Sequence, residues 1–270
     1  MVISVIGSSS LIALDADTGR LKWHFQFTPH DVWDFDASHV PVLVDRIVHG
    51  RLRKLVLMAN KNAFYYVLDR ETGELLSATQ FSPQTWTDGL DEKGRPRVRT
   101  SAIPTKQWTA VRPSMYGATN WHSPAYSPAT GLFYFTVRDM GGVNRTHDDA
   151  PIRGQHYWGG TATFDREGTT SMKVKALRAE TGQPVWEFSL RSTVQSGLMA
   201  TAGGLIFGGT GEGNLFALDA DSGKPLWSFQ TGGVIGGNPV AFAIRGTQYV
   251  VTPAGNALIG FSLADTTTRH

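Results

Sequence analysis

The 270-residue chain contains no cysteine. This absence excludes disulfide bonds, zinc–thiolate sites, iron–sulfur clusters and cysteine nucleophiles. The chain also lacks an excess of one charge, because 25 Lys and Arg residues against 23 Asp and Glu residues leave a net charge of +2. A balance this even, with no Lys/Arg cluster in one stretch, argues against a nucleic-acid partner.

Long hydrophobic runs are missing as well. No stretch approaches the roughly 18 apolar residues of a membrane-spanning helix, so we expect no membrane span. Residues 1–7 show neither a basic start nor a small-residue cleavage site, so the sequence predicts no signal peptide here. A hydrophobic content of 41% with 18% charged residues is nevertheless enough to fill a core.

Glycine and aromatic residues are abundant. The chain has 30 glycines, about 11% against a usual ~7%, and eight of its residues are tryptophan. Helix formers in helical register are scarce, and the apolar runs are short. This combination is typical of an all-β protein with many tight turns.

One short pattern occurs four times, at residues 13–23, 67–77, 176–186 and 217–227. Each copy reads as a strand, a turn that ends in Thr-Gly or Ser-Gly, and a second strand. Glycine supplies the positive φ that the turn needs, while Asp and Thr or Ser bond to the turn backbone. The pattern therefore predicts four hairpins.

Three of the four hairpins carry a tryptophan on the second strand, at Trp23, Trp186 and Trp227. A large flat side chain that faces the next sheet can fill the wedge between two sheets. The second hairpin has Ser77 at this place, so we expect a looser contact there.

Another strand–turn–strand pattern precedes two of the hairpins, at 125–135 and 199–208. Joined to the hairpin that follows, each gives four antiparallel strands, which is one blade of a β-propeller. We therefore expect an all-β fold with a single partial propeller domain over residues 1–270. The expected blades are 1–27 (partial), 38–81, 122–190 with an insertion at 140–172, 198–230 and 234–263 (partial).

Segments outside the repeat give a family resemblance. They are residues 28–36, residues 60–70, the pair Asn120-Trp121, and residues 199–204. With the Trp-docking repeat, these segments make residues 11–261 resemble the C-terminal half of the quinoprotein alcohol dehydrogenases, which depend on pyrroloquinoline quinone (PQQ). The resemblance implies about half of an eight-bladed propeller. It also implies a periplasmic oxidoreductase that oxidises an alcohol to an aldehyde with PQQ and Ca²⁺ or a lanthanide.

The resemblance indicates three cofactor-binding residues, Lys61, Asn120 and Trp121. A cation at Lys61 can bond a quinone oxygen and stabilise the negative charge that develops on reduction. The Asn120 amide can bond a carbonyl or carboxylate, and Trp121 offers a flat face to a planar ring system. Simpler interpretations are a solvated turn lysine, and a loop asparagine beside a packed tryptophan.

Two other polar segments are open to more than one interpretation. Residues 30–36 contain a histidine and three carboxylates, which could bind a metal. We favour a connection that packs on the blades and caps one face. The insertion carries His156, Tyr157 and Trp158, which could form a lid or a substrate rim. A disordered or merely decorative loop is the other interpretation.

The chain also departs from the family pattern. The family's catalytic aspartate, which is a metal ligand and general base, falls where residues 3–7 hold no carboxylate. Gln195 and Arg138 stand where the family has Trp and Asn. The other metal ligands belong to the N-terminal half, so we predict no catalytic residue and no metal ligand in this truncated sequence. Little or no dehydrogenase activity is expected of the chain alone.

Roughly four blades do not close an eight-bladed ring, and the uncovered faces would expose apolar surface. We therefore expect a partner chain or self-association, besides the small-molecule alcohol. A fragment, a ring of two copies and a small closed ring all stay open. The alternative function is a non-catalytic propeller scaffold that binds a protein or a glycan, which would have no reason to keep Lys61 with Asn120 and Trp121.

Overall fold

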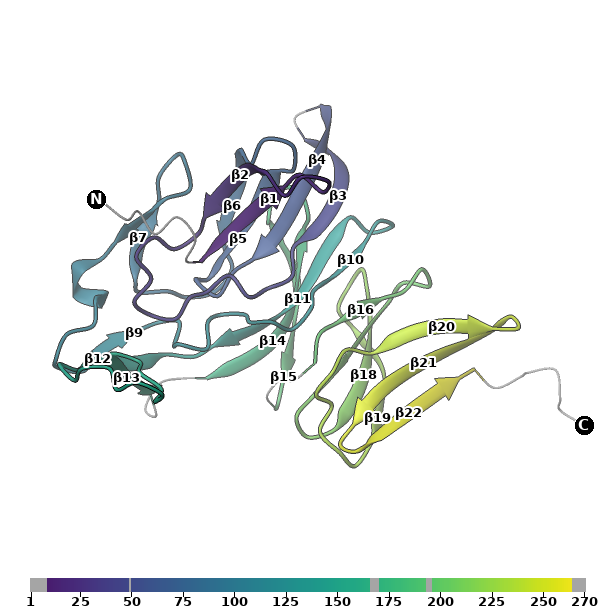
Figure 1. The fold of residues 1–270 in the computed structure, drawn as a ribbon. Helices are drawn as coiled ribbons and strands as arrows, with labels where there is room; N and C mark the ends of the chain where they lie inside the picture. Colours follow the sequence, from purple (N-terminus) through teal and green to yellow (C-terminus); the bar gives the residue numbers. More distant parts are fainter. Residues whose placement is uncertain (1–8, 49, 166–169, 193–195, 264–270) are drawn as a thin grey trace, which may run out of the picture. The chain divides into compact units, whose positions relative to one another are not determined.

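A computed structural model of the chain describes residues 9–48, 50–165, 170–192 and 196–263. The regular secondary structure of these residues consists of antiparallel strands and one 3₁₀ turn (Figure 1). The chain divides into two compact units. Unit 1 comprises Met1–Trp121, Val137–Ser171 and Arg178–Gln183, and unit 2 comprises His122–Thr136, Met172–Leu177 and Pro184–His270.

The main sheet of unit 1 has four antiparallel strands in sequential order. They are β3 (Val42–Val48), β4 (Arg51–Ala59), β5 (Phe64–Asp69) and β6 (Leu75–Gln80). Every residue of β5 is buried, and its aromatic and branched side chains suit a strand covered on both faces. A two-stranded hairpin, β1 (Ser10–Leu14) and β2 (Leu21–Gln26), precedes this sheet. These strands include the first two predicted hairpins.

Unit 1 also contains strands that the sequence analysis did not predict. A hairpin forms from β7 (Thr87–Leu90) and β8 (Pro96–Val98), and η1 (Thr100–Ala102) is a single 3₁₀ turn. In a three-stranded sheet, β12 (Gly142–Thr146) pairs with β9 (Thr109–Val111) on one side and β13 (Gly160–Phe164) on the other. The insertion at 140–172 therefore contains a hairpin whose sheet is completed by a strand far earlier in the chain.

Three further antiparallel sheets lie largely in unit 2. The first consists of β10 (Ala125–Ser127), β11 (Leu132–Asp139), β14 (Ser171–Arg178) and β15 (Pro184–Leu190). The second consists of β16 (Met199–Ala200), β17 (Leu205–Gly209), β18 (Asn214–Asp219) and β19 (Pro225–Gln230). The third has three strands, β20 (Val240–Ile244), β21 (Thr247–Ala254) and β22 (Ala257–Ser262). The predicted four-stranded antiparallel sheets are thus confirmed.

Tryptophan side chains dock on glycine turns, as the repeat predicts. The Trp23 indole donates a hydrogen bond to the Arg70 carbonyl at 3.0 Å. A Cβ atom on Gly73 would lie only 2.8 Å from the Trp23 ring, and on Gly223 only 2.5 Å from the Trp186 ring. Both glycines also have positive φ, so each turn needs glycine for its backbone and for the ring that rests on it.

The contact at Ser77 is not the loose one that the sequence analysis expects. The hydroxyl groups of Ser77 and Thr79 both donate to the Thr181 carbonyl, at 3.1 and 3.0 Å. The Tyr65 hydroxyl donates to the Ala179 carbonyl at 2.7 Å. Tyr65 on β5, together with Ser77 and Thr79 on β6, therefore fills the place that an indole fills elsewhere.

Each unit has its own core. In unit 1, aromatic residues on the connection before β3 pack against side chains of β4 and β5 and against Trp86. The fully buried large side chains of this core include Phe27, Phe35, Tyr66 and Trp86. Among the described residues, no helix is long and apolar enough to cross a membrane.

Candidate quinone site

The connection between β2 and β3 alternates aromatic and acidic residues. Trp33 and Phe35 are buried, and the Trp33 indole donates to the Ala102 carbonyl at 2.7 Å. In contrast, the side chains of Asp34 and Asp36 are more than half exposed and face outward. The backbone of Asp34 has a φ of +67°, a conformation that aspartate tolerates better than most residues.

Lys61 lies in the tight turn between β4 and β5, and its side chain is only 4% exposed. Its ammonium group lies 2.7 Å from Asp36 Oδ1 and 3.2 Å from Asp34 Oδ2. Both carboxylates are more than half exposed, so the lysine is buried beneath an acidic pair that faces water. Lys61 is therefore not a solvated turn lysine.

In this cluster, burial and the charge of Lys61 shift the pKa of Asp34 in opposite directions. Desolvation raises the pKa of Asp34, and the nearby Lys61 ammonium partly opposes this rise. Desolvation also raises the pKa of Asp31, which accepts hydrogen bonds from the Ser9 hydroxyl and the Trp33 backbone. Partial desolvation is thus the main cause of the raised pKa of both Asp31 and Asp34.

Residues 114–121 cover the stem of Lys61. The backbone N–H of Ala118 donates to the Lys61 carbonyl at 2.9 Å. A Cβ atom on Gly117 would lie 2.5 Å from the Lys61 side chain, so only glycine allows this approach. The burial of Lys61 thus depends on a glycine more than fifty residues away in the sequence.

Asn120 connects this covering segment to the acidic connection. Its side-chain oxygen accepts hydrogen bonds from the Trp121 backbone at 2.8 Å and from the Ser38 hydroxyl at 3.3 Å. Its side-chain nitrogen donates to the Tyr116 carbonyl at 2.9 Å. Trp121 follows directly and is 52% exposed. The structure therefore brings the predicted residues Lys61, Asn120 and Trp121 into one neighbourhood of unit 1.

Several residues of this neighbourhood were missed from the sequence. The sequence analysis assigned Asp34 and Asp36 to a packing and capping connection, although their alternation with Trp33 and Phe35 was a usable signal. The sequence analysis names Arg138 only as a departure from the family pattern. Burial lowers its pKa, and its guanidinium carbon lies 5.4 Å from the centre of the Tyr116 ring. Only the tertiary contacts show this cation–π pair.

The donors around Lys61 suit a quinone. An ammonium carries three N–H groups and a primary amide carries two. The two aspartates accept two bonds from Lys61, and the Tyr116 carbonyl accepts one from Asn120. One N–H on each side chain can still serve a carbonyl or carboxylate oxygen. With the half-exposed indole of Trp121, this set offers hydrogen-bond donors and a flat face of the kind that a planar quinone needs.

A metal ion fits less well. Among the residues that the structure describes, no three His, Asp or Glu side chains come together in a way that could hold one. The acidic pair Asp34 and Asp36 is engaged with Lys61. Residues 3–7 and Gln195, where the sequence departs from the family pattern, lie outside the described residues.

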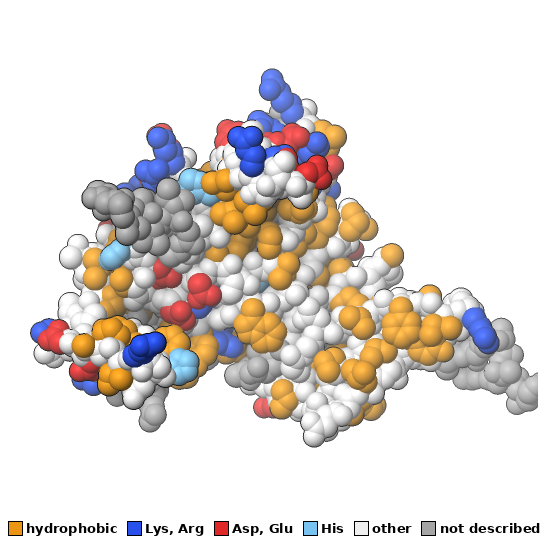
Figure 2. Space-filling model, viewed as in Figure 1, with side chains coloured by type: hydrophobic (Ala, Val, Ile, Leu, Met, Phe, Trp, Pro, Cys, Tyr) orange, Lys and Arg blue, Asp and Glu red, His pale blue; other side chains and the backbone are white. Residues whose placement is uncertain are grey.

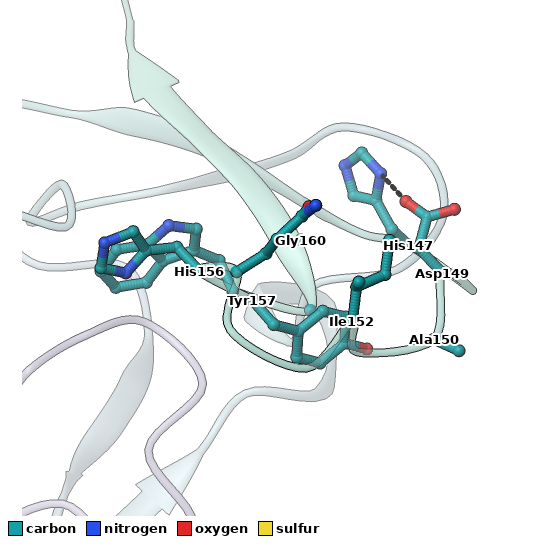
Figure 3. A pocket seen from close by; sticks show the side chains of 10 residues that line it. His147, Asp149, Ala150, Ile152, His156, Tyr157 and Gly160 are labelled. Atoms are coloured by element: carbon teal, nitrogen blue, oxygen red, sulfur yellow. Dashed lines mark ion pairs between the residues drawn. The ribbon is translucent and has the colours of Figure 1, made fainter.

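His156, Tyr157 and Trp158 lie in the loop between β12 and β13 and line a pocket of unit 1 (Figure 3). Neither their proposed lid role nor a role as substrate rim is tested by these contacts.

Four-stranded antiparallel sheets that dock through tryptophan and glycine define the chain as part of a β-propeller. Comparison with known proteins shows which propellers the chain is similar to. Residues 7–89 match the family model described as "Glucose/ethanol/alcohol dehydrogenase, beta-propeller domain". Residues 170–270 match the model described as "Outer membrane protein assembly factor BamB".

Curated relatives are quinoprotein dehydrogenases. Over 264 residues the chain is 34% identical to quinohemoprotein alcohol dehydrogenase ADH-IIG of Pseudomonas putida, covering 92% of this chain and 37% of that protein. Over 257 residues it is 35% identical to quinoprotein alcohol dehydrogenase PedH of Pseudomonas putida, covering 92% of this chain and 43% of the relative. The chain therefore spans about two fifths of the length of these relatives.

Solved structures of quinoprotein dehydrogenases are also similar to the chain. The structure of ADHIIG from Pseudomonas putida HK5 aligns with a TM-score of 0.85 at 34% identity, covering 93% of this chain and 39% of that one. A europium-containing methanol dehydrogenase aligns with the same TM-score at 32% identity, covering 91% and 44%. The predicted resemblance to the C-terminal half of PQQ-dependent alcohol dehydrogenases is thereby confirmed, as is the partial propeller fold.

Proposed function

We propose that this chain supplies the quinone-binding half of a PQQ-dependent dehydrogenase that oxidises a small alcohol to an aldehyde. The observation that carries the proposal is the buried Lys61, held by two aspartates beside Asn120 and Trp121. The similarity to quinoprotein alcohol dehydrogenases over 92% of the chain supports the reaction class.

PQQ, when bound, accepts the two electrons that leave the alcohol as it becomes an aldehyde. The task of Lys61 is to donate a hydrogen bond to a quinone oxygen and to stabilise negative charge there. Its low exposure strengthens this interaction, because water screens a buried charge less. Asp34 and Asp36 fix the position of the ammonium, and Trp121 offers a flat face for the ring system.

Binding is the direct test of this role. We would titrate the purified chain with PQQ, with and without Ca²⁺, and follow the quenching of tryptophan fluorescence. Lys61→Met keeps the apolar stem but loses the charge, and we expect it to weaken binding by about tenfold or more, as for a hydrogen bond to a charged group. The matched control is Lys54→Met, since Lys54 is an exposed lysine on β4 that pairs with Glu71.

Saturable binding that only Lys61→Met weakens would support the proposal. Absence of saturation, or equal effects of both variants, would contradict it and favour the non-catalytic scaffold.

Catalysis requires more than this half-site. The described residues offer no metal cluster, and residues 3–7 contain no carboxylate to act as the general base. We therefore expect little or no dye-linked ethanol oxidation by the chain with PQQ and Ca²⁺. Robust turnover by the purified chain would overturn this expectation, and a Lys61→Met control would show whether that turnover uses the proposed site.

A partner chain or a second copy is proposed to complete the site, in the periplasm by analogy with the family. Exposed apolar side chains on the last sheet support such a partner. Figure 2 shows hydrophobic side chains over β20 to β22. Those that are exposed there include Val240, Phe242, Ile244 and Leu258. Apolar surface of this kind is a common mark of protein contact.

A further inference from the structure

The loop between β12 and β13 forms a pocket that the proposed quinone site does not use. Its volume is about 340 Å³, at the small end of the range for ligand pockets. Figure 3 shows side chains of this loop around the opening. The lining residues that matter here are His147, Asp149, Ile152, His156, Tyr157 and Trp158.

Aromatic faces dominate one part of the lining. Trp158 is 82% exposed and Tyr157 is 48% exposed, although large aromatic side chains are usually more buried. The His156 ring lies nearly parallel to the Trp158 ring, at 13° and a centroid distance of 6.3 Å. A Cβ atom on Gly159 would lie 3.8 Å from the Tyr157 ring, so the phenol lies over this glycine.

Apart from two histidines, the lining carries one ionisable side chain with a formal charge at neutral pH. Asp149 is the single acidic side chain among the lining residues, and they include no Lys or Arg. Asp149 Oδ2 lies 3.4 Å from His147 Nδ1. The other ring nitrogen of His147 lies 2.7 Å from the Thr161 hydroxyl of β13, so the histidine links the carboxylate to the sheet. Such a lining repels phosphate and other anions and attracts cations.

We propose that this pocket binds a small organic cation, of the quaternary or tertiary ammonium class. The ring faces of Trp158 and Tyr157 attract the positive charge through their π systems, and the Asp149 carboxylate supplies the counter-charge. This site is separate from the proposed quinone function and does not depend on it.

The test compares choline with 3,3-dimethyl-1-butanol, which has the same shape without the charge. Both are titrated into the full chain at pH 8, up to about 50 mM because exposed cation–π sites are weak. Calorimetry and tryptophan fluorescence report binding. We expect saturable binding of choline that is at least about threefold tighter than that of the neutral alcohol.

Variants locate the site. Trp158→Ala and Asp149→Asn should each weaken choline binding by about two- to fivefold. Trp227→Ala, which removes another exposed tryptophan on β19, should leave the Kd unchanged. Circular dichroism checks the fold of each variant, and Trp158→Leu replaces Trp158→Ala if the latter does not fold. Equal binding of both probes, no saturation by choline, or insensitivity to the Trp158 and Asp149 variants would overturn the proposal.

Discussion

Lys61 carries a charge that is costly to bury, and the two carboxylates beside it offset that cost. The ammonium is held at 2.7 Å from Asp36 and 3.2 Å from Asp34. These two bonds orient the Lys61 ammonium within the chain itself. Such preorganisation is what makes a fixed charge effective in stabilising charge that develops during a reaction.

Asp34 leads to a prediction about pH. Burial raises the pKa of its carboxyl in the folded chain, so between the unfolded and the folded pKa the folded state binds more protons than the unfolded state. Stability attributable to Asp34 is therefore largest at low pH and falls as the pH rises through its folded pKa. Carboxyl groups with a lowered pKa, such as Asp69, act in the opposite direction, so the test is a comparison. Urea unfolding at pH 4 to 7 should show that the native chain loses stability relative to Asp34→Asn as the pH rises.

The Lys61→Met variant is the complementary measurement. Loss of the ammonium removes the interaction that lowers the pKa of Asp34, so NMR titration should place this pKa higher in the variant. An unchanged or lower value would contradict the ion pair.

Among the structural elements, the repeated hairpin turns are specified most strongly by local sequence. Asp69 accepts hydrogen bonds from the backbone of Glu71 and Thr72, and Gly73 has a φ of +76°. The same glycine receives the Trp23 ring from the preceding hairpin. One short segment therefore serves both the turn and the contact between two sheets.

Substitutions at two glycines distinguish the role in the turn from the role in the contact between sheets. Gly73→Ala combines the strain of positive φ with a steric clash against Trp23, whereas Gly19 has a similar φ of +68° and nothing within 4 Å of a Cβ atom. We expect Gly19→Ala to lower the free energy of unfolding by about 1 kcal/mol. For Gly73→Ala we expect a further loss of about 1–3 kcal/mol from overpacking. Urea unfolding measures both, and equal losses would show that the indole contact adds nothing.

At the scale of the whole molecule, exposed apolar side chains are the feature that supports the proposed partner chain. Besides the last sheet, Trp227 on β19 is 41% exposed, although its ring contacts Phe261. The equivalent tryptophans Trp23 and Trp186 each rest on a glycine turn. Apolar surface in a sheet-forming protein favours association with another chain.

Light scattering tests self-association. We expect the mass of the purified chain to rise above that of a monomer as its concentration increases, and Phe242→Lys to reduce this rise because it places a charge on the exposed face of β20. Ile103→Lys, at an exposed position after η1, is the control. A monomer mass at every concentration would exclude self-association and leave a different partner chain as the proposal.

Much of the fold follows from the sequence. Hairpin turns are determined locally, because glycine, aspartate and threonine act on the backbone within a few residues. The strands on each side of such a turn then pair with little freedom in register. In contrast, β9 is three residues long and pairs with β12 more than thirty residues later. No local pattern predicts a strand whose stability comes from so distant a partner.

For the candidate site too, some features follow from the sequence and others only from the tertiary structure. The sequence by itself determined the all-β class, the docking turns and the resemblance that selects Lys61, Asn120 and Trp121. Only the tertiary structure decided that Lys61 is buried, because Gly117 covers its stem, and that Asp34 and Asp36 meet its ammonium. Burial and ion pairing depend on residues brought together from distant parts of the chain, whereas turn chemistry acts between neighbours.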